Sequence, residues 1–122
     1  MAQEVTKATS KSSTNPTNAI RREHEIRVYQ IASRDQESVN AMFTSWDRLK
    51  RYGIKFDPSR YKSVYNGKMN VKDLDDAYAQ LQGQKPDGYK GHSLSVSDVV
   101  VMDGKAYFVD DFGFRKLRNK MK

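Results

Sequence analysis

The sequence has no cysteine, only two histidines, three prolines and one tryptophan, and no long apolar run. Without cysteine the chain has no disulfide, no thiol chemistry and no cysteine-based zinc site. Two histidines are too few for a histidine metal site on their own. No apolar run approaches the roughly 20 residues that span a bilayer, and no signal-peptide core is visible. We therefore expect a cytoplasmic protein that has no cofactor, no metal site and no membrane partner.

The length of 122 residues is that of one domain with a single modest core. Residues 1–22 are rich in Ser, Thr, Asn and Lys and have few large apolar side chains, so they cannot offset the entropy cost of ordering. We predict a disordered arm over residues 1–22, a folded domain over 23–117 and a basic tail over 118–122.

Charge is unevenly distributed along the chain, whose formal net charge is +7. Basic residues outnumber acidic ones in 45–72 and again in 115–122, whereas aspartates dominate 73–111. Such asymmetry favours association with a polyanion or with an acidic protein surface. Solvated faces that keep a small protein soluble would produce the same pattern, because basic character alone is a weak signal for nucleic-acid binding.

The first half of the domain alternates between strand and helix patterns. Apolar and polar residues alternate over 26–31, which predicts a strand. Apolar residues at helical spacing then predict one helix over 36–52, with Gly53 as its left-handed C-cap. A second short strand is predicted over 61–65, followed by a tight turn at Asn66-Gly67.

The second half is expected to hold one helix and a hairpin. Asn70 is the predicted cap of a helix over 71–81, followed by a loop over 83–88. Strands over 99–102 and 105–109 flank Asp103-Gly104, a two-residue hairpin turn. Residues 112–117 form a last short strand. We predict an α+β fold, with two helices packed on one face of a small, mostly antiparallel sheet of four to five strands. The run 99–102 is apolar on both faces and should be central.

One cluster of polar side chains resembles a nucleophilic site. It contains His92, Ser93, Ser95 and Asp98. A Ser/His/Asp site needs convergent geometry and an oxyanion hole, whereas side chains this close along an extended segment point in alternating directions. We interpret the cluster as a turn in which Ser and Asp bond nearby backbone amides, and we expect no catalytic residue.

Two further patterns have structural explanations. Asp103, Asp110 and Asp111 have the oxygen ligands of a divalent cation site, but a strand separates the first from the other two by roughly 16 Å. The aromatic residues of the 36–52 helix follow its apolar stripe, so they are expected in the core. Phe112 and Phe114 beside Arg115 and Lys116 place aromatics next to cations, as single-strand binders do.

The segment from about Tyr29 to Leu117 resembles the YodL-like domain family. The resemblance rests most on the block Gly91-His-Ser-Leu-Ser-Val-Ser-Asp-Val-Val. We call Gly91–Asp98, together with the start of the strand that follows, the fingerprint segment. Softer matches are Tyr29-Gln30, Tyr61 with Val64-Tyr65, Leu74 with Ala77-Tyr78, and Tyr107 to Phe114. The resemblance implies a cytosolic, cofactor-free bacterial domain tied to mobile elements, with no established enzymatic activity.

The expected function is therefore binding rather than catalysis. We expect a non-enzymatic accessory protein of a phage or plasmid that binds and inhibits a host protein or nucleoprotein complex, such as a CRISPR effector nuclease. The alternative is a sequence-tolerant nucleic-acid-binding module. Arginine binds carboxylates or phosphates in a bidentate manner, so both hypotheses use the same basic surface. Its expected residues are Arg48, Lys50, Arg51, Lys55, Arg60, Lys62, Arg115, Lys116 and Arg118.

Overall fold

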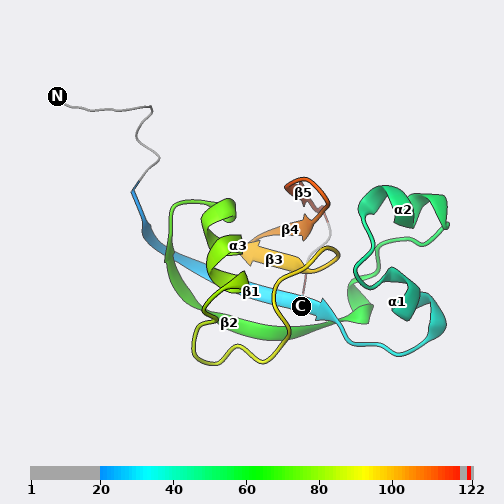
Figure 1. Ribbon diagram of the computed structural model, residues 1–122, viewed down its shortest axis with the longest axis horizontal. Helices are drawn as coiled ribbons and strands as arrows, with labels where there is room; N and C mark the ends of the chain where they lie inside the picture. Colours follow the sequence, from blue (N-terminus) through cyan, green and yellow to red (C-terminus); the bar gives the residue numbers. More distant parts are fainter. Residues whose placement is uncertain (1–19, 119–120, 122) are drawn as a thin grey trace.

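The computed structural model describes residues 20–118 and 121, which form a five-stranded antiparallel sheet with three α-helices (Figure 1). The strand order is β2-β1-β3-β4-β5. The elements are β1 (Arg22–Ile31), α1 (Gln36–Ala41), α2 (Trp46–Arg51), the 3₁₀ turn η2 (Pro58–Arg60), β2 (Tyr61–Val71), α3 (Leu74–Gln82), β3 (Val99–Met102), β4 (Lys105–Val109) and β5 (Phe114–Lys116). The predicted α+β class and strand number are confirmed.

The middle of the sheet is where the sequence is most apolar. Val99, Val100 and Val101 are at most 3% exposed, and β3 lies between β1 and β4. The prediction of a central strand that is buried on both faces is therefore confirmed. Asp103 and Gly104 adopt the left-handed φ values of 50° and 83° that a two-residue hairpin requires, so the predicted turn between β3 and β4 is also confirmed.

The helices contribute to core clusters on opposite faces of the sheet, not on one face as predicted. Ala77 and Leu81 of α3 pack into one core cluster with Val28. Ala41 of α1 and Leu49 of α2 belong to a second cluster. Members of the two clusters alternate along β1 and β3, as side chains on the two faces of a strand must. We call the side with α3 the α3 face and the side with α1 and α2 the α2 face. In Figure 1, α1 and α2 lie together at the end of the sheet where β1 ends.

The predicted single helix over 36–52 is wrong, because two short helices replace it. Phe43 has a left-handed φ of 60°, and its amide donates to Ser97 Oγ at 2.9 Å instead of continuing the helix. Ser45 then caps α2 by accepting from the Arg48 amide. The break turns Phe43 and Tyr52 outward, at 60% and 61% exposure, so the expected burial of these two rings is also wrong. Gly53, at φ +71°, ends α2 as predicted.

Two smaller predictions are corrected next to β2. Asn66-Gly67 is not a turn but lies inside β2, where Gly67 pairs with Ile26. Asn70 is also still in the strand, and Asp73 caps α3 by accepting from the Asp76 amide at 2.9 Å. Both predictions relied on local turn and cap signals, which pairing with the long β1 strand overrides.

The ends of the domain differ slightly from the expected boundaries. Residues 1–19 of the predicted arm lie outside the described residues, while Arg22 already belongs to β1. Of the predicted basic tail, residues 119, 120 and 122 also lie outside them, and Met121 is 8% exposed in the core of the α2 face. Among the helices of the described chain, none has the length and apolar content that a bilayer span requires.

Candidate partner-binding surface

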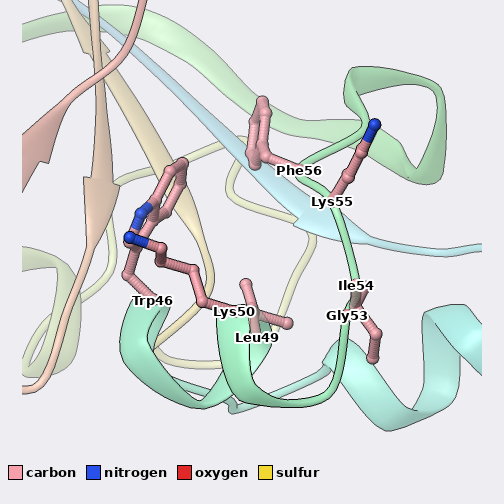
Figure 2. A pocket seen from close by; sticks show the side chains of 7 residues that line it. All are labelled: Trp46, Leu49, Lys50, Gly53, Ile54, Lys55 and Phe56. Atoms are coloured by element: carbon pink, nitrogen blue, oxygen red, sulfur yellow. The ribbon is translucent and has the colours of Figure 1, made fainter.

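An apolar groove of about 550 Å³ lies beside α2 and has lysines among its lining residues. Figure 2 shows that Trp46, Leu49 and Lys50 come from the helix, and that Gly53 to Phe56 come from the segment that follows it. The aromatic rings of Trp46 and Phe56 have centroids 6.1 Å apart, and Trp46 also packs edge-on against Phe108 of the sheet. The groove is therefore anchored to the core of the α2 face.

Four of the predicted binding residues lie in α2 or in the segment that follows it. Arg48, Lys50, Arg51 and Lys55 are all exposed, and within residues 20–118 none of them forms an ion pair. Lys50 and Lys55 line the groove itself. We call this set the α2 surface: the groove with Arg48, Lys50, Arg51 and Lys55. It combines accessible apolar area with unpaired positive charge.

Arg60 is not available for a partner, in contrast to the prediction. Only 11% of its side chain is exposed, and its guanidinium donates to Ser38 Oγ at 2.9 Å and pairs with Glu37. Asp35 Oδ2 lies 3.7 Å from Arg60 Nη1. The sequence could not reveal this, because the three partners precede Arg60 by more than 20 residues along the chain. Arg60 instead fixes η2 against α1.

The remaining predicted cations are spread over both edges of the sheet. Lys62 is exposed on β2, the edge strand opposite β5, so the structure does not bring it near the C-terminal cations. The Arg115 guanidinium stacks over Trp46 at 5.2 Å from the ring centroid, and its Nε lies 3.6 Å from Asp110. Arg115 thus joins the α2 surface, while Lys116 and Arg118 lie elsewhere.

Lys116 and Arg118 line a second groove, of about 390 Å³, together with two cations that the sequence did not identify. These are Arg27 of β1 and Lys105 of β4. No local signal marks them, because Arg27 lies in an alternating strand and Lys105 follows a hairpin turn. Only the strand order β1-β3-β4-β5 brings them beside the C-terminal segment.

The fingerprint segment forms a buried polar network around Gln30 of β1, which is 4% exposed. The Gln30 amide nitrogen donates to the His92 carbonyl at 2.8 Å and to Asp98 Oδ2 at 3.0 Å, and its oxygen accepts from the His92 amide at 3.2 Å. The Tyr89 hydroxyl donates to the same carbonyl at 2.8 Å. A glutamine at an inward position of an alternating strand was the sequence signal for this network.

The other polar residues of the fingerprint segment bond locally, as the turn interpretation predicts. Asp98 Oδ2 accepts from the Ser95 amide at 2.8 Å, and Ser95 Oγ donates to the Ser93 carbonyl at 2.8 Å. His92 Nδ1 lies 2.8 Å from the Ser93 carbonyl. The side chains of His92, Ser95 and Asp98, which resembled part of a nucleophilic site, thus hold the loop, with the Ser93 carbonyl as a shared acceptor.

Burial raises the pKa of Asp98 to about 7, although the Ser95 amide, His92 and Gln30 act in the opposite direction. The carboxyl is only 2% exposed, so its ionised form loses most of its hydration. Burial and then the nearby Asp98 charge raise the pKa of Tyr89 to about 12. Both shifts have burial behind the fingerprint segment as their largest cause.

Gly91 is required by close packing and not by backbone conformation. A Cβ at this position would lie 2.9 Å from Gln30 Cδ and 3.0 Å from Val64 Cβ. Any side chain would therefore push Gln30 out of the polar network. This explains the glycine that opens the fingerprint segment.

The aspartates that were considered for a cation site have separate partners. Asp103 Oδ2 lies 2.6 Å from His24 Nδ1, and its Oδ1 accepts from the Glu25 amide. Asp110 Oδ1 accepts from the Trp46 amide at 3.1 Å, so this residue helps to begin α2. Over the described part of the chain, no three acidic or histidine side chains gather where they could hold a metal.

Comparison with known proteins adds a family to this geometry. No curated protein and no solved structure matches the chain. The YodL-like domain model matches residues 25–119, a range that holds the buried network around Gln30, the central hairpin and the cations of both grooves. The chain therefore belongs to the YodL-like domain family.

Proposed function

We propose that this YodL-like protein is a non-enzymatic accessory protein of a mobile genetic element, such as a phage or plasmid. In this proposal it binds and inhibits a host protein or nucleoprotein complex, for example a CRISPR effector nuclease. The mobile-element context comes from the family resemblance, and the binding role comes from the α2 surface. The observation that carries the proposal is an apolar groove whose lysines have no acidic partner among the residues that the structure describes.

The chemistry of the α2 surface favours a protein partner. Protein interfaces obtain most of their affinity from aromatic or aliphatic anchors that enter pockets, surrounded by a polar rim. The groove lined by Trp46, Leu49, Ile54 and Phe56 can receive such an anchor, and Lys50 and Lys55, which also line it, supply a basic rim. The complementary partner surface carries an apolar side chain flanked by carboxylates.

A pull-down from nuclease-treated host lysate tests this proposal. The wild-type chain is compared with Lys50→Glu/Lys55→Glu and with a control that makes the same charge change on the exposed Lys68 and Lys72. We expect a stoichiometric protein to be recovered with wild type and control, and to be lost with the α2-surface variant. The recovered protein must also be an enzyme whose activity falls when the pure wild-type chain is added.

Two results would contradict the proposal. One is the absence of any stoichiometric protein after nuclease treatment, with a bait that circular dichroism shows to be folded. The other is equal loss of the partner with both charge-reversal variants, which would indicate attraction by net charge and not docking at the α2 surface.

The alternative function, a sequence-tolerant nucleic-acid-binding module, is favoured by a different observation. Within the described part of the chain, the groove beside β5 is lined by four cations and no acidic residue. Salt-sensitive binding to oligonucleotides of unrelated sequence is the result that this alternative predicts.

A further inference from the structure

We propose that the groove lined by Arg27, Lys105, Lys116 and Arg118 binds the phosphate backbone of a nucleic acid. We call it the β5 groove. The inference rests on the nucleic-acid alternative and gives it a site that is separate from the α2 surface. It assigns a role to Arg27 and Lys105, which lie far from the other cations in sequence.

Positive charge is concentrated in the β5 groove. Among the residues that the structure describes, its lining contains two arginines and two lysines, and no carboxylate. None of these four cations forms an ion pair with any acid of the described chain. Asp103, the acid beside the hairpin, is instead bonded to His24 and to the Glu25 amide. Asp103 still lies close enough to Lys105 for this lysine to contribute to the lowered pKa of its carboxyl, after His24 and the Glu25 amide. The other three cations of the groove are open to an entering anion.

Arg27 is already held in position. Its Nη1 donates to the Tyr29 hydroxyl at 2.9 Å, and its Cζ lies 5.8 Å from the centre of the Tyr29 ring. A guanidinium that is fixed in this way loses little entropy when it binds a phosphate in a bidentate manner. Lys105 and Lys116 line the groove from the ends of β4 and β5, and their long flexible stems let Nζ adjust to a bound anion.

The width of the groove suits more than one phosphate. Arg27 of β1 pairs with Val101 of β3, and Val101 pairs with Ala106 of β4. The Leu117 amide donates to the Ala106 carbonyl, so the floor of the groove crosses four adjacent chain segments. Neighbouring segments lie about 4.8 Å apart, so the floor is about 14 Å wide. A nucleic-acid strand carries one phosphate per about 3.4 Å of helix axis, so two or more phosphates fit across the groove.

The lining of the groove argues against a protein ligand. Val101, Ala106, Leu117 and Met121 of the floor are between 3% and 8% exposed. The lining of the β5 groove is more polar than that of the groove beside α2, and it holds four cations where the other holds two. This charge favours a phosphate backbone, whereas the more apolar groove beside α2 favours the anchoring side chain of a protein.

Fluorescence anisotropy with labelled oligonucleotides tests the inference. The probes are single-stranded DNA and RNA and a DNA duplex, of two unrelated sequences each, titrated at about 50 mM salt and then at increasing salt. The groove variant is Lys105→Gln/Lys116→Gln/Arg118→Gln. The matched control is Lys68→Gln/Lys72→Gln/Lys85→Gln, which removes the same charge from exposed positions outside the groove.

We expect the wild type to bind at least one class of probe without regard to sequence. The groove variant should bind about tenfold more weakly or worse, and its slope of log affinity against log salt should be shallower by about 2. The control should stay within about threefold of wild type, since its charges are distant from the phosphates. Arg27→Lys keeps the charge but loses the fixed guanidinium, so it should also weaken binding.

Three outcomes would overturn the inference. The wild type could bind no probe at about 50 mM salt, or both triple variants could weaken binding equally. The third is that polyglutamate displaces the labelled oligonucleotide as effectively as unlabelled oligonucleotide does. Thermal unfolding checks that each variant folds, and Arg118→Gln alone replaces the groove triple if that variant does not. Lys50→Gln/Lys55→Gln, on the α2 surface, should keep oligonucleotide binding. Loss of the protein partner and loss of the oligonucleotide are therefore separate results.

Discussion

Replacing Asp98 by Asn should make the protein more stable at neutral pH while leaving its fold unchanged. Asp98 Oδ2 accepts two hydrogen bonds, from the Ser95 amide at 2.8 Å and from the Gln30 amide at 3.0 Å. The carbonyl oxygen of an asparagine can accept the same two bonds. The substitution therefore removes the titration of a buried carboxyl and keeps its role as an acceptor.

The magnitude follows from the raised pKa of Asp98, about 7 in the folded chain against an ordinary value of 3.8. Between these two pH values the unfolded chain has lost the Asp98 proton, whereas the folded chain still holds it. The unfolded state binds fewer protons, so the free energy of unfolding falls as pH rises from about 4 to about 7. The slope is about 1.4 kcal/mol per pH unit, which limits the total loss to about 4 kcal/mol.

Urea unfolding of wild type and Asp98→Asn at several pH values between about 4 and 8 measures this effect. The stability of the variant relative to wild type should increase with pH and level off above about 7, with a gain of roughly 2–4 kcal/mol. Asp87→Asn, at an exposed loop position, is the control and should show no such trend. A difference that is independent of pH, or that grows toward acid pH, would refute the reasoning.

Two other stability predictions follow from the described contacts. Gly91→Ala should lower the free energy of unfolding by about 2 kcal/mol or more, because the new Cβ displaces the buried, hydrogen-bonded side chain of Gln30. Its control is Lys90→Ala at the exposed neighbouring position, which should change the free energy of unfolding by no more than about 0.5 kcal/mol. Equal effects in urea unfolding would mean that the loop relaxes. Arg60→Gln should lower the free energy of unfolding by about 1–3 kcal/mol, because it removes a largely buried guanidinium from the Ser38 hydroxyl and from the carboxylates of Asp35 and Glu37. The exposed Lys62→Gln is its control, and a loss as small as that of the control would show that the tether contributes nothing.

The sheet could be predicted from the sequence wherever local signals and burial agree. Asp103-Gly104 specifies a two-residue turn, and the valines of 99–101 have no polar neighbour that would turn one face to solvent. These features determine a hairpin at the centre of the sheet whatever surrounds it. Gly53 likewise marks the end of α2, because few other residues adopt its φ of +71° without cost.

The break between α1 and α2 could not be predicted in the same way. The apolar residues of 36–52 fit one continuous helix, and Ser45 alone is a weak signal for a new start. The break is stabilised by the Ser97 hydroxyl at the Phe43 amide and by the Asp110 carboxylate at the Trp46 amide. Both partners lie more than 50 residues further along the chain, so only the folded domain provides them.

The candidate binding residues show the same limit. Composition identified the basic segments, but strand order decides which cations are close together. Arg60 lies in a basic segment and is nonetheless tied to α1, whereas Arg27 lies outside these segments and yet lines the β5 groove. A side chain's availability depends on long-range pairing, and the sequence does not contain that pairing explicitly.

The fingerprint segment therefore acts on function indirectly. Ser97 has a left-handed φ of 82° and follows the turn that is bonded to Gln30. Its hydroxyl oxygen accepts a hydrogen bond from the Phe43 amide, just after the end of α1. The buried network thus determines where α2 begins, and α2 carries the groove of the α2 surface. The β5 groove lies on the same face of the sheet, with Arg115 between them over Trp46. The acidic first turn of α3 lies on the opposite face, away from both grooves.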